Sequence, residues 1–119
     1  MDESGTTVES FVETTIRYHS VWSLWSVSGW VLCNSAFYQD TDVIPFWTSE
    51  ADAAQHCNGE WRAFKPEKIE LEEFINVWLP DLAKDDVLLG VEWDEALNGI
   101  ELEAEELAVI YQKYFSVSH

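Results

Sequence analysis

The sequence predicts a single α+β domain with a mainly antiparallel sheet of about five strands packed with three to four helices. Apolar residues repeat at helical spacing in several segments, runs rich in β-branched and aromatic residues lie between these segments, and turn signals separate the runs. The expected order is α-ββ-β-α-α-ββ-α, which is typical of this fold class. With 119 residues, the chain fits one domain. We expect residues 1–5 to form a disordered N-terminus and residues 6–116 to form the domain.

The first part of the chain predicts a helix followed by a hairpin. A capping box, a Thr with a Glu three residues later, starts at Thr6, and apolar residues then continue at helical spacing to about Tyr18. The runs 21–26 and 29–35 are rich in aromatic and β-branched residues, and a Ser-Gly turn separates them. Apolar side chains fall on both faces of each run. The two strands are therefore covered on both sides, or covered on one and partly exposed on the other.

A short strand and a second helix follow. The strand is expected at 43–47 and contains Pro45, which a sheet tolerates only at an edge or a bulge. Thr48 or Ser49 is expected to cap a helix that stops near Gly59.

A turn and a third helix come next. Lys65-Pro66 marks the turn, and an apolar repeat that begins at Leu71 predicts the helix. Pro80 should end or kink this helix near Leu79, because proline removes a helical hydrogen bond.

The last part of the chain predicts a second strand pair and a final helix. The runs 87–93 and 99–104 read as antiparallel strands, and the helix continues from Leu107 to Phe115.

The charge of the chain is strongly negative. Twenty-three acidic residues against six basic ones give −17, and residues 67–106 alone hold fourteen acids and two lysines. Such a field repels nucleic acids and anionic membranes and attracts cations and basic proteins. We therefore expect no nucleic-acid and no membrane partner. A highly soluble surface without any partner explains the same charge.

The sequence also predicts a cytoplasmic location. No segment has the length of apolar chain that a membrane span needs, and the first ten residues, MDESGTTVES, lack the pattern of a signal peptide. Cys33 and Cys57 are too few for a disulfide framework.

The sequence contains no catalytic signature, and we expect no metal and no cofactor. His56-Cys57 is the nearest approach to a zinc motif, but neighbouring helical residues point about 100° apart, so Cys57 should pack inward and His56 outward. Glu101 and Glu103 share a strand face near Glu92, where a polar outer face of the sheet is a sufficient explanation. Nucleophile elbows, P-loops and dinucleotide fingerprints are absent from the sequence. The chain thus reads more as a binding protein than as an enzyme.

Three tryptophans lie at the ends of predicted elements beside carboxylates. An indole next to a carboxylate suits a cationic or amphipathic ligand, because it combines an apolar, cation-π surface with a counter-charge. The alternative is that these tryptophans cap the core and expose only an edge. The candidate binding residues are Trp47, Glu50, Trp61, Trp93 and Asp94.

Several segments together resemble a known family. The segments are VWSLW, GWVLCNS, TDVIPFWTSEADAA, IELEEFINVWLP and LLGVEWDEALNGIELE, between about Val21 and Leu107, and PFW-S-E, F-x-x-x-WLP and GV-x-WD are the best markers. The chain resembles the bacterial family known as domain of unknown function 2750. The resemblance implies a bacterial, cytoplasmic, stand-alone α+β domain, and it brings no catalytic residues to carry over.

Three functional hypotheses remain. The first is a non-enzymatic interaction protein whose acidic face binds a basic protein partner. The alternative is a small-molecule binder or cryptic hydrolase that uses the tryptophan and carboxylate ends of its elements. The third is an oligomeric structural protein joined through exposed sheet aromatics, and the chain is expected to be a monomer or a small homo-oligomer.

Overall fold

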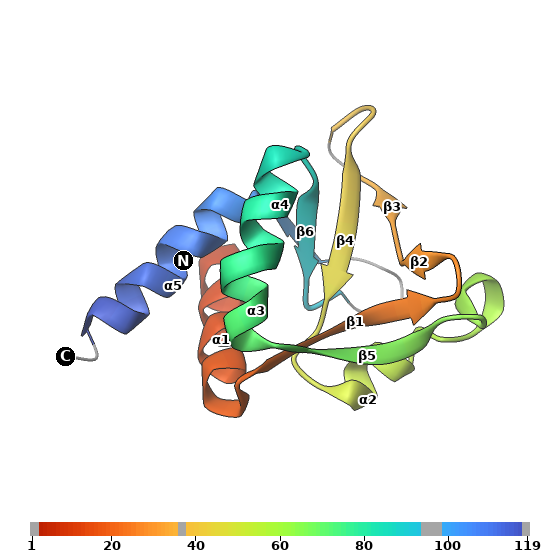
Figure 1. Cartoon of the computed structure of the whole chain (residues 1–119), viewed down its shortest axis with the longest axis horizontal. Helices are drawn as coiled ribbons and strands as arrows, with labels where there is room; N and C mark the ends of the chain where they lie inside the picture. The colour runs from red at the N-terminus through yellow and green to blue at the C-terminus, as the bar shows by residue number, and fades with distance from the viewer. Residues whose placement is uncertain (1–2, 36–37, 94–98, 118–119) are drawn as a thin grey trace.

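Two β-sheets meet at the centre of the computed structural model, which describes residues 3–35, 38–93 and 99–117 (Figure 1). One sheet has the strand order β2-β1-β5 and the other β3-β4-β6-β7. The strands are β1 (Ser20–Ser26), β2 (Gly29–Trp30), β3 (Cys33–Asn34), β4 (Asp42–Phe46), β5 (Lys65–Glu70), β6 (Leu88–Val91) and β7 (Ile100–Leu102). The helical elements are α1 (Glu3–Tyr18), α2 (Glu50–Ala54), η1 (Gly59–Trp61), α3 (Leu71–Glu73), η2 (Phe74–Trp78), α4 (Leu79–Lys84) and α5 (Ala104–Val117).

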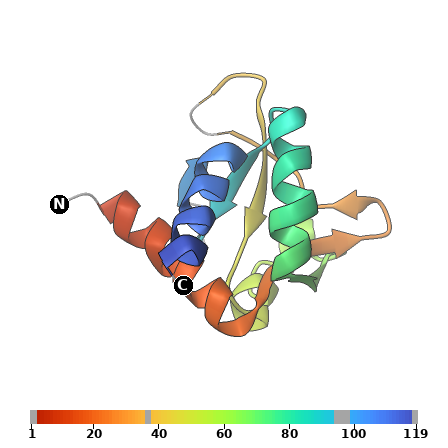
Figure 2. The ribbon, with the colours of Figure 1, turned by 60° about the vertical axis from the view of Figure 1, so that its left-hand side comes forward.

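The predicted α+β class is confirmed. Within the described residues, β4 and β6 pair in parallel and the other four strand pairings are antiparallel. Figures 1 and 2 show α1, the α3–α4 helix and α5 gathered on one side of the β4–β6 strands, with β1, β5 and α2 on the other. Helix α1 begins at Glu3, ahead of the predicted capping box at Thr6. The domain boundary at residue 6 stays a prediction.

The predicted hairpin forms, but its second strand divides between the two sheets. Trp25 pairs with Trp30 across the turn, and Gly29 adopts a φ of 119° that only glycine takes without strain. Cys33–Asn34 then leaves the hairpin and pairs with β4 in the other sheet. This division is one reason why the described chain has more strands than the predicted five.

The predicted turn at Lys65-Pro66 is wrong, because these residues begin strand β5. This strand pairs antiparallel with β1, from Ser20 opposite Glu70 to Trp25 opposite Lys65. It is an edge strand, so Pro66 and a row of charged side chains are tolerated there. Ile69 alone among its residues is buried, which explains why the pattern gave no strand signal.

The third predicted helix continues past Pro80 instead of ending. The predicted disruption takes the form of the π-helical segment η2, in which the Leu79 N–H bonds to the Phe74 carbonyl five residues earlier. The segment ends two residues before Pro80, which lacks the N–H that a regular helix needs for a hydrogen bond to the carbonyl four residues earlier. The helix then runs on as α4 to Lys84.

The β4–β6 strands are buried on both faces. Ile44 and Phe46 of β4 pack into the core beneath α1, α3–α4 and α5, whereas Val43 and Trp47 pack into a second core against β1 and α2. Ser23 of β1 donates a hydrogen bond to the Pro45 carbonyl at 2.8 Å. The nitrogen of Pro45 therefore points toward β1, away from the β6 ladder, so the proline removes no sheet hydrogen bond.

Candidate functional site

The structure spreads the predicted binding residues over buried and exposed positions. Trp47 and Trp93 are buried, with 1% and 5% of their surface exposed. Trp61 is partly exposed, and Glu50 is exposed at the start of α2, which Ser49 caps as predicted by accepting from the Asp52 N–H at 3.1 Å. Asp94 lies outside the described residues. Their binding roles stay predictions.

Packing explains the two buried tryptophans. The Trp47 indole N–H donates to the Trp93 carbonyl at 3.1 Å, and the Trp93 indole N–H donates to the Ile100 carbonyl at 3.4 Å. The Trp93 ring lies over two glycines, and a β-carbon at Gly90 or Gly99 would come within 2.4 Å of it. Both indoles are therefore satisfied parts of the second core.

A polar cluster lies at the carboxyl ends of β4 and β6, which we call the strand-end cluster: Thr48, Asp52, His56 and Glu92. Helix α2 follows β4 in the chain (Figure 1). Its residue Asp52 lies near Glu92, and His56, in the turn after the helix, lies on Trp47. His56 is buried, with 6% of its surface exposed, and its ring stacks on Trp47 at a centroid distance of 4.7 Å. The prediction that His56 faces outward is wrong, because α2 ends at Ala54 and the following turn redirects the chain.

Glu92 is the most unusual residue of the strand-end cluster. It has a φ of +54°, a left-handed conformation that costs a non-glycine residue about 1–2 kcal/mol. Burial raises the pKa of its carboxyl, the nearby Asp52 carboxylate raises it further, and hydrogen bonds from Thr48 oppose the shift. Its Oε1 atom is buried without a hydrogen-bond partner among the described residues, and so is Nε2 of His56.

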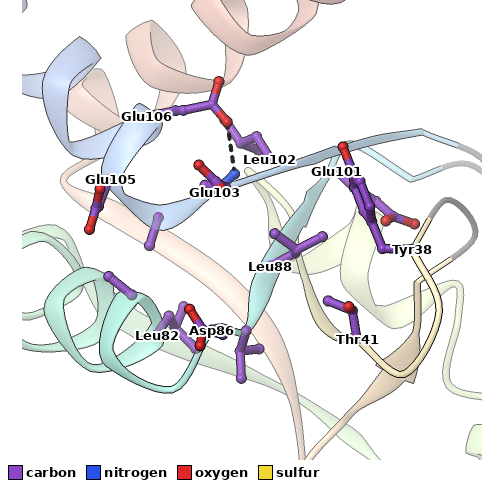
Figure 3. Close-up of a pocket in the computed structure, with 13 residues that line it drawn as sticks. Tyr38, Thr41, Leu82, Asp86, Leu88, Glu101, Leu102, Glu103, Glu105 and Glu106 are labelled. Carbon is purple, nitrogen blue, oxygen red and sulfur yellow. Dashed lines mark hydrogen bonds between the residues drawn. The ribbon is translucent and has the colours of Figure 1, made fainter.

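An acidic groove lies at the opposite, amino-terminal end of the same strand pair (Figure 3). It has a volume of about 660 Å³ and is bounded by the segment before β4, the α4–β6 connection and the β7–α5 connection. Five of its lining residues are acidic, and none is Lys or Arg. The groove is lined by Tyr38, Thr41, Leu82, Ala83, Asp86, Val87, Leu88, Glu101, Leu102, Glu103, Ala104, Glu105 and Glu106.

The floor of the acidic groove is apolar and its rim is charged. Leu82, Leu88 and Leu102 are each buried and belong to the two cores beneath the groove. Asp86 and Glu103 are exposed. An apolar floor with a carboxylate rim suits a chain that carries both aliphatic stems and positive ends.

Local hydrogen bonds fix parts of the rim. The Glu106 carboxylate accepts a hydrogen bond from the Glu103 N–H at 3.2 Å. This is one of the two hydrogen bonds that make up a capping box, and it lies at the start of α5. The Ser35 hydroxyl donates to Glu101 at 2.5 Å. Strand β7 ends at Leu102, so Glu101 and Glu103 do not share a strand face as predicted, yet both line the groove.

The described residues offer no group of three His, Cys, Asp or Glu side chains placed to hold a metal ion. Burial and the neighbouring Glu101 raise the pKa of Cys33 to about 11, and burial also raises the pKa of Cys57. Both cysteines therefore stay thiols at neutral pH, which disfavours nucleophilic chemistry. No described helix is long and apolar enough to cross a membrane.

A family model described as "Protein of unknown function (DUF2750)" matches residues 8–109. The chain belongs to the DUF2750 family. The matched region contains every residue of the acidic groove and of the strand-end cluster. The suspected family membership is confirmed. No curated protein matches the chain.

Proposed function

We propose that this DUF2750 protein is a non-enzymatic interaction protein whose acidic groove binds a basic segment of a protein partner in the bacterial cytoplasm. The observation that carries the proposal is the lining of the groove, which combines five carboxylates with an apolar floor and contains no basic side chain. A lysine or arginine chain matches both parts, because its stem is apolar and its end is positive.

The charge of the whole molecule supports the same partner class. At −17, the protein attracts positively charged segments over several ångströms and accelerates their encounter at low ionic strength. The described part of the chain contains one ion pair, between Lys68 and Glu70 at 3.7 Å, so most acids are not neutralised from within. The acidic side chains of the groove therefore repel one another, and a positively charged partner that binds there reduces this repulsion.

Binding of a synthetic peptide of alternating lysine and alanine, measured by calorimetry, tests the proposal. The triple variant Asp86→Asn, Glu103→Gln, Glu105→Gln removes three exposed charges from the rim. Asparagine suits position 86, where φ is +57°. At about 0.2–1 kcal/mol per exposed pair, the loss should weaken binding roughly tenfold at low salt.

A second triple variant separates the groove from general charge. Glu9→Gln, Glu67→Gln and Glu73→Gln remove three exposed acids from other surfaces and give the same net charge. This control should retain most of the affinity, and a peptide with glutamine in place of lysine should not bind. Equal weakening by both triple variants, or no binding by the unmodified protein at low salt, contradicts the proposal.

A further inference from the structure

The strand-end cluster contains two polar atoms that the fold leaves without partners. Oε1 of Glu92 and Nε2 of His56 are both buried and lack a hydrogen-bond partner among the described residues. A buried polar atom without a partner is costly, by about as much as a lost hydrogen bond, and is rare in native proteins. Two of them at one end of the same strand pair indicate that something supplies the missing contacts.

A chain of contacts connects the residues that carry the two atoms. His56 stacks on Trp47, Trp47 immediately precedes Thr48, and Thr48 hydrogen-bonds to Glu92. The Trp47 indole N–H also bonds to the carbonyl of the residue after Glu92. The strand-end cluster lies at the carboxyl ends of two parallel strands, where open sheets that contain parallel strands commonly bind ligands.

The chemistry of the cluster selects a positively charged donor. A carboxylate oxygen accepts hydrogen bonds, and so does an unprotonated imidazole nitrogen. Asp52 adds a second negative charge beside Glu92, and no described salt bridge brings a lysine or arginine to either. The partly exposed Trp61 indole lies at a centroid distance of 6.2 Å from His56 and supplies an aromatic face that favours organic cations. The buried Trp47 indole stacks on the His56 ring at 4.7 Å and holds that ring in place.

We propose that the strand-end cluster is a binding site for a protonated primary amine, whose N–H groups bond to Glu92 Oε1 and His56 Nε2. Glu92 is the counter-charge, and the indole of Trp61, which is partly exposed, covers the alkyl chain of the ligand. Glu92 adopts a left-handed backbone, of the kind that often occurs at ligand sites, and its carboxylate hydrogen-bonds to Thr48. The site is distinct from the acidic groove, because the two lie at opposite ends of β4 and β6.

Titration of the full chain with n-butylamine, followed by NMR of the indole N–H and imidazole nitrogen signals, tests the proposal. We expect saturable shifts at Trp47, Trp61 and His56. Glu92→Gln removes the counter-charge and keeps the size of the side chain, so it should weaken binding roughly tenfold to a hundredfold. Glu67→Gln, at an exposed position of β5, lowers the net charge equally and should leave the affinity unchanged.

A test on the unmodified protein keeps the proposal falsifiable if Glu92→Gln does not fold. Tetramethylammonium has the same charge as butylammonium but no N–H donor, so it should bind at least tenfold more weakly. Equal binding of the two cations, equal weakening by both single variants, or unsaturable shifts overturns the proposal.

The source of the amine is a further arm of the experiment. A peptide with one lysine that competes with n-butylamine indicates that the site takes a lysine side chain, and failure to compete indicates a free amine. The groove triple variant Asp86→Asn, Glu103→Gln, Glu105→Gln should leave amine binding intact. Loss of peptide binding with retained amine binding therefore separates this site from the proposed function of the groove.

Discussion

Replacing Gly90 with alanine should destabilise the protein through one identifiable clash. Gly90 lies in the buried strand β6, and an added β-carbon would meet the Trp93 indole at 2.4 Å from Cε2, 2.5 Å from Cζ2 and 2.6 Å from Nε1. Two contacts hold the indole in place: its Cδ1 atom lies 2.4 Å from where a β-carbon at Gly99 would be, and its N–H bonds to the Ile100 carbonyl. To relieve the clash, either the Trp93 ring must move out of the second core or β6 must shift away from it.

The expected magnitude follows from overpacking a filled core. Such substitutions cost about 1–3 kcal/mol, which for a chain of this length lowers the melting temperature by roughly 3–12 °C. Urea unfolding followed by far-ultraviolet circular dichroism measures the loss without depending on tryptophan fluorescence. The slope of the transition should stay unchanged, so that the midpoint reports stability directly.

A double-mutant cycle with Trp93→Phe identifies the cause. The smaller ring frees the space that a β-carbon at position 90 needs, so Gly90→Ala should cost little in the Trp93→Phe background. A coupling energy of about 1 kcal/mol or more supports the packing described here. If Gly90→Ala has the same effect in both backgrounds, or no effect in either, the position assigned to Trp93 is wrong.

Three other perturbations have expected outcomes. Burial and Asp52 raise the pKa of Glu92, so the folded state binds a proton at this carboxyl more tightly than the unfolded chain does. The stability that this proton contributes is present below the ordinary pKa of 4.5 and is lost as pH rises through the raised pKa. Glu92→Gln should therefore be more favourable, relative to the unmodified protein, at pH 7 than at pH 4, and an identical difference at both pH values contradicts this. The Tyr111 hydroxyl bonds to Thr15 at 2.7 Å, and Thr15 donates to the Val12 carbonyl at 2.9 Å. Tyr111→Phe should cost about 1 kcal/mol and Thr15→Val up to about 3 kcal/mol, because only the second leaves a buried hydroxyl donor unpaired, and the reverse order in urea unfolding argues against this network. Added salt should raise the melting temperature, since it screens repulsion within a chain of charge −17, and a flat dependence at low ionic strength tells against it.

The sequence predicts most elements because their side chains repeat with clear periods. Helices α1 and α5 carry apolar residues at helical spacing, β6 is a continuous apolar run buried on both faces, and the Ser49 cap is a local signal. Strand β5 escapes prediction because an edge strand with charges on its exposed positions has no apolar alternation. The parallel pairing of β4 with β6 joins residues that lie more than forty positions apart, and no local pattern encodes it.

The two candidate sites are also only partly predictable from the sequence, because each depends on the folded chain. The acidic charge of residues 67–106 predicts an acidic face, yet the groove also needs Tyr38 and Thr41, which reach it only through the sheet. The strand-end cluster depends on the turn after α2, which carries His56 inward, and on the left-handed backbone at Glu92. Neither feature follows from residue type, since histidine is often exposed and glutamate rarely adopts a positive φ.

Mapping the lysine–alanine peptide onto the protein by amide chemical shifts tests the central claim most directly. If the acidic groove binds the basic segment, the shifts should concentrate on residues 101–106, Asp86 and Tyr38, and should weaken as salt is added. Shifts of similar size distributed over all exposed acidic residues would show that the peptide follows the net charge alone and would contradict a groove-specific function.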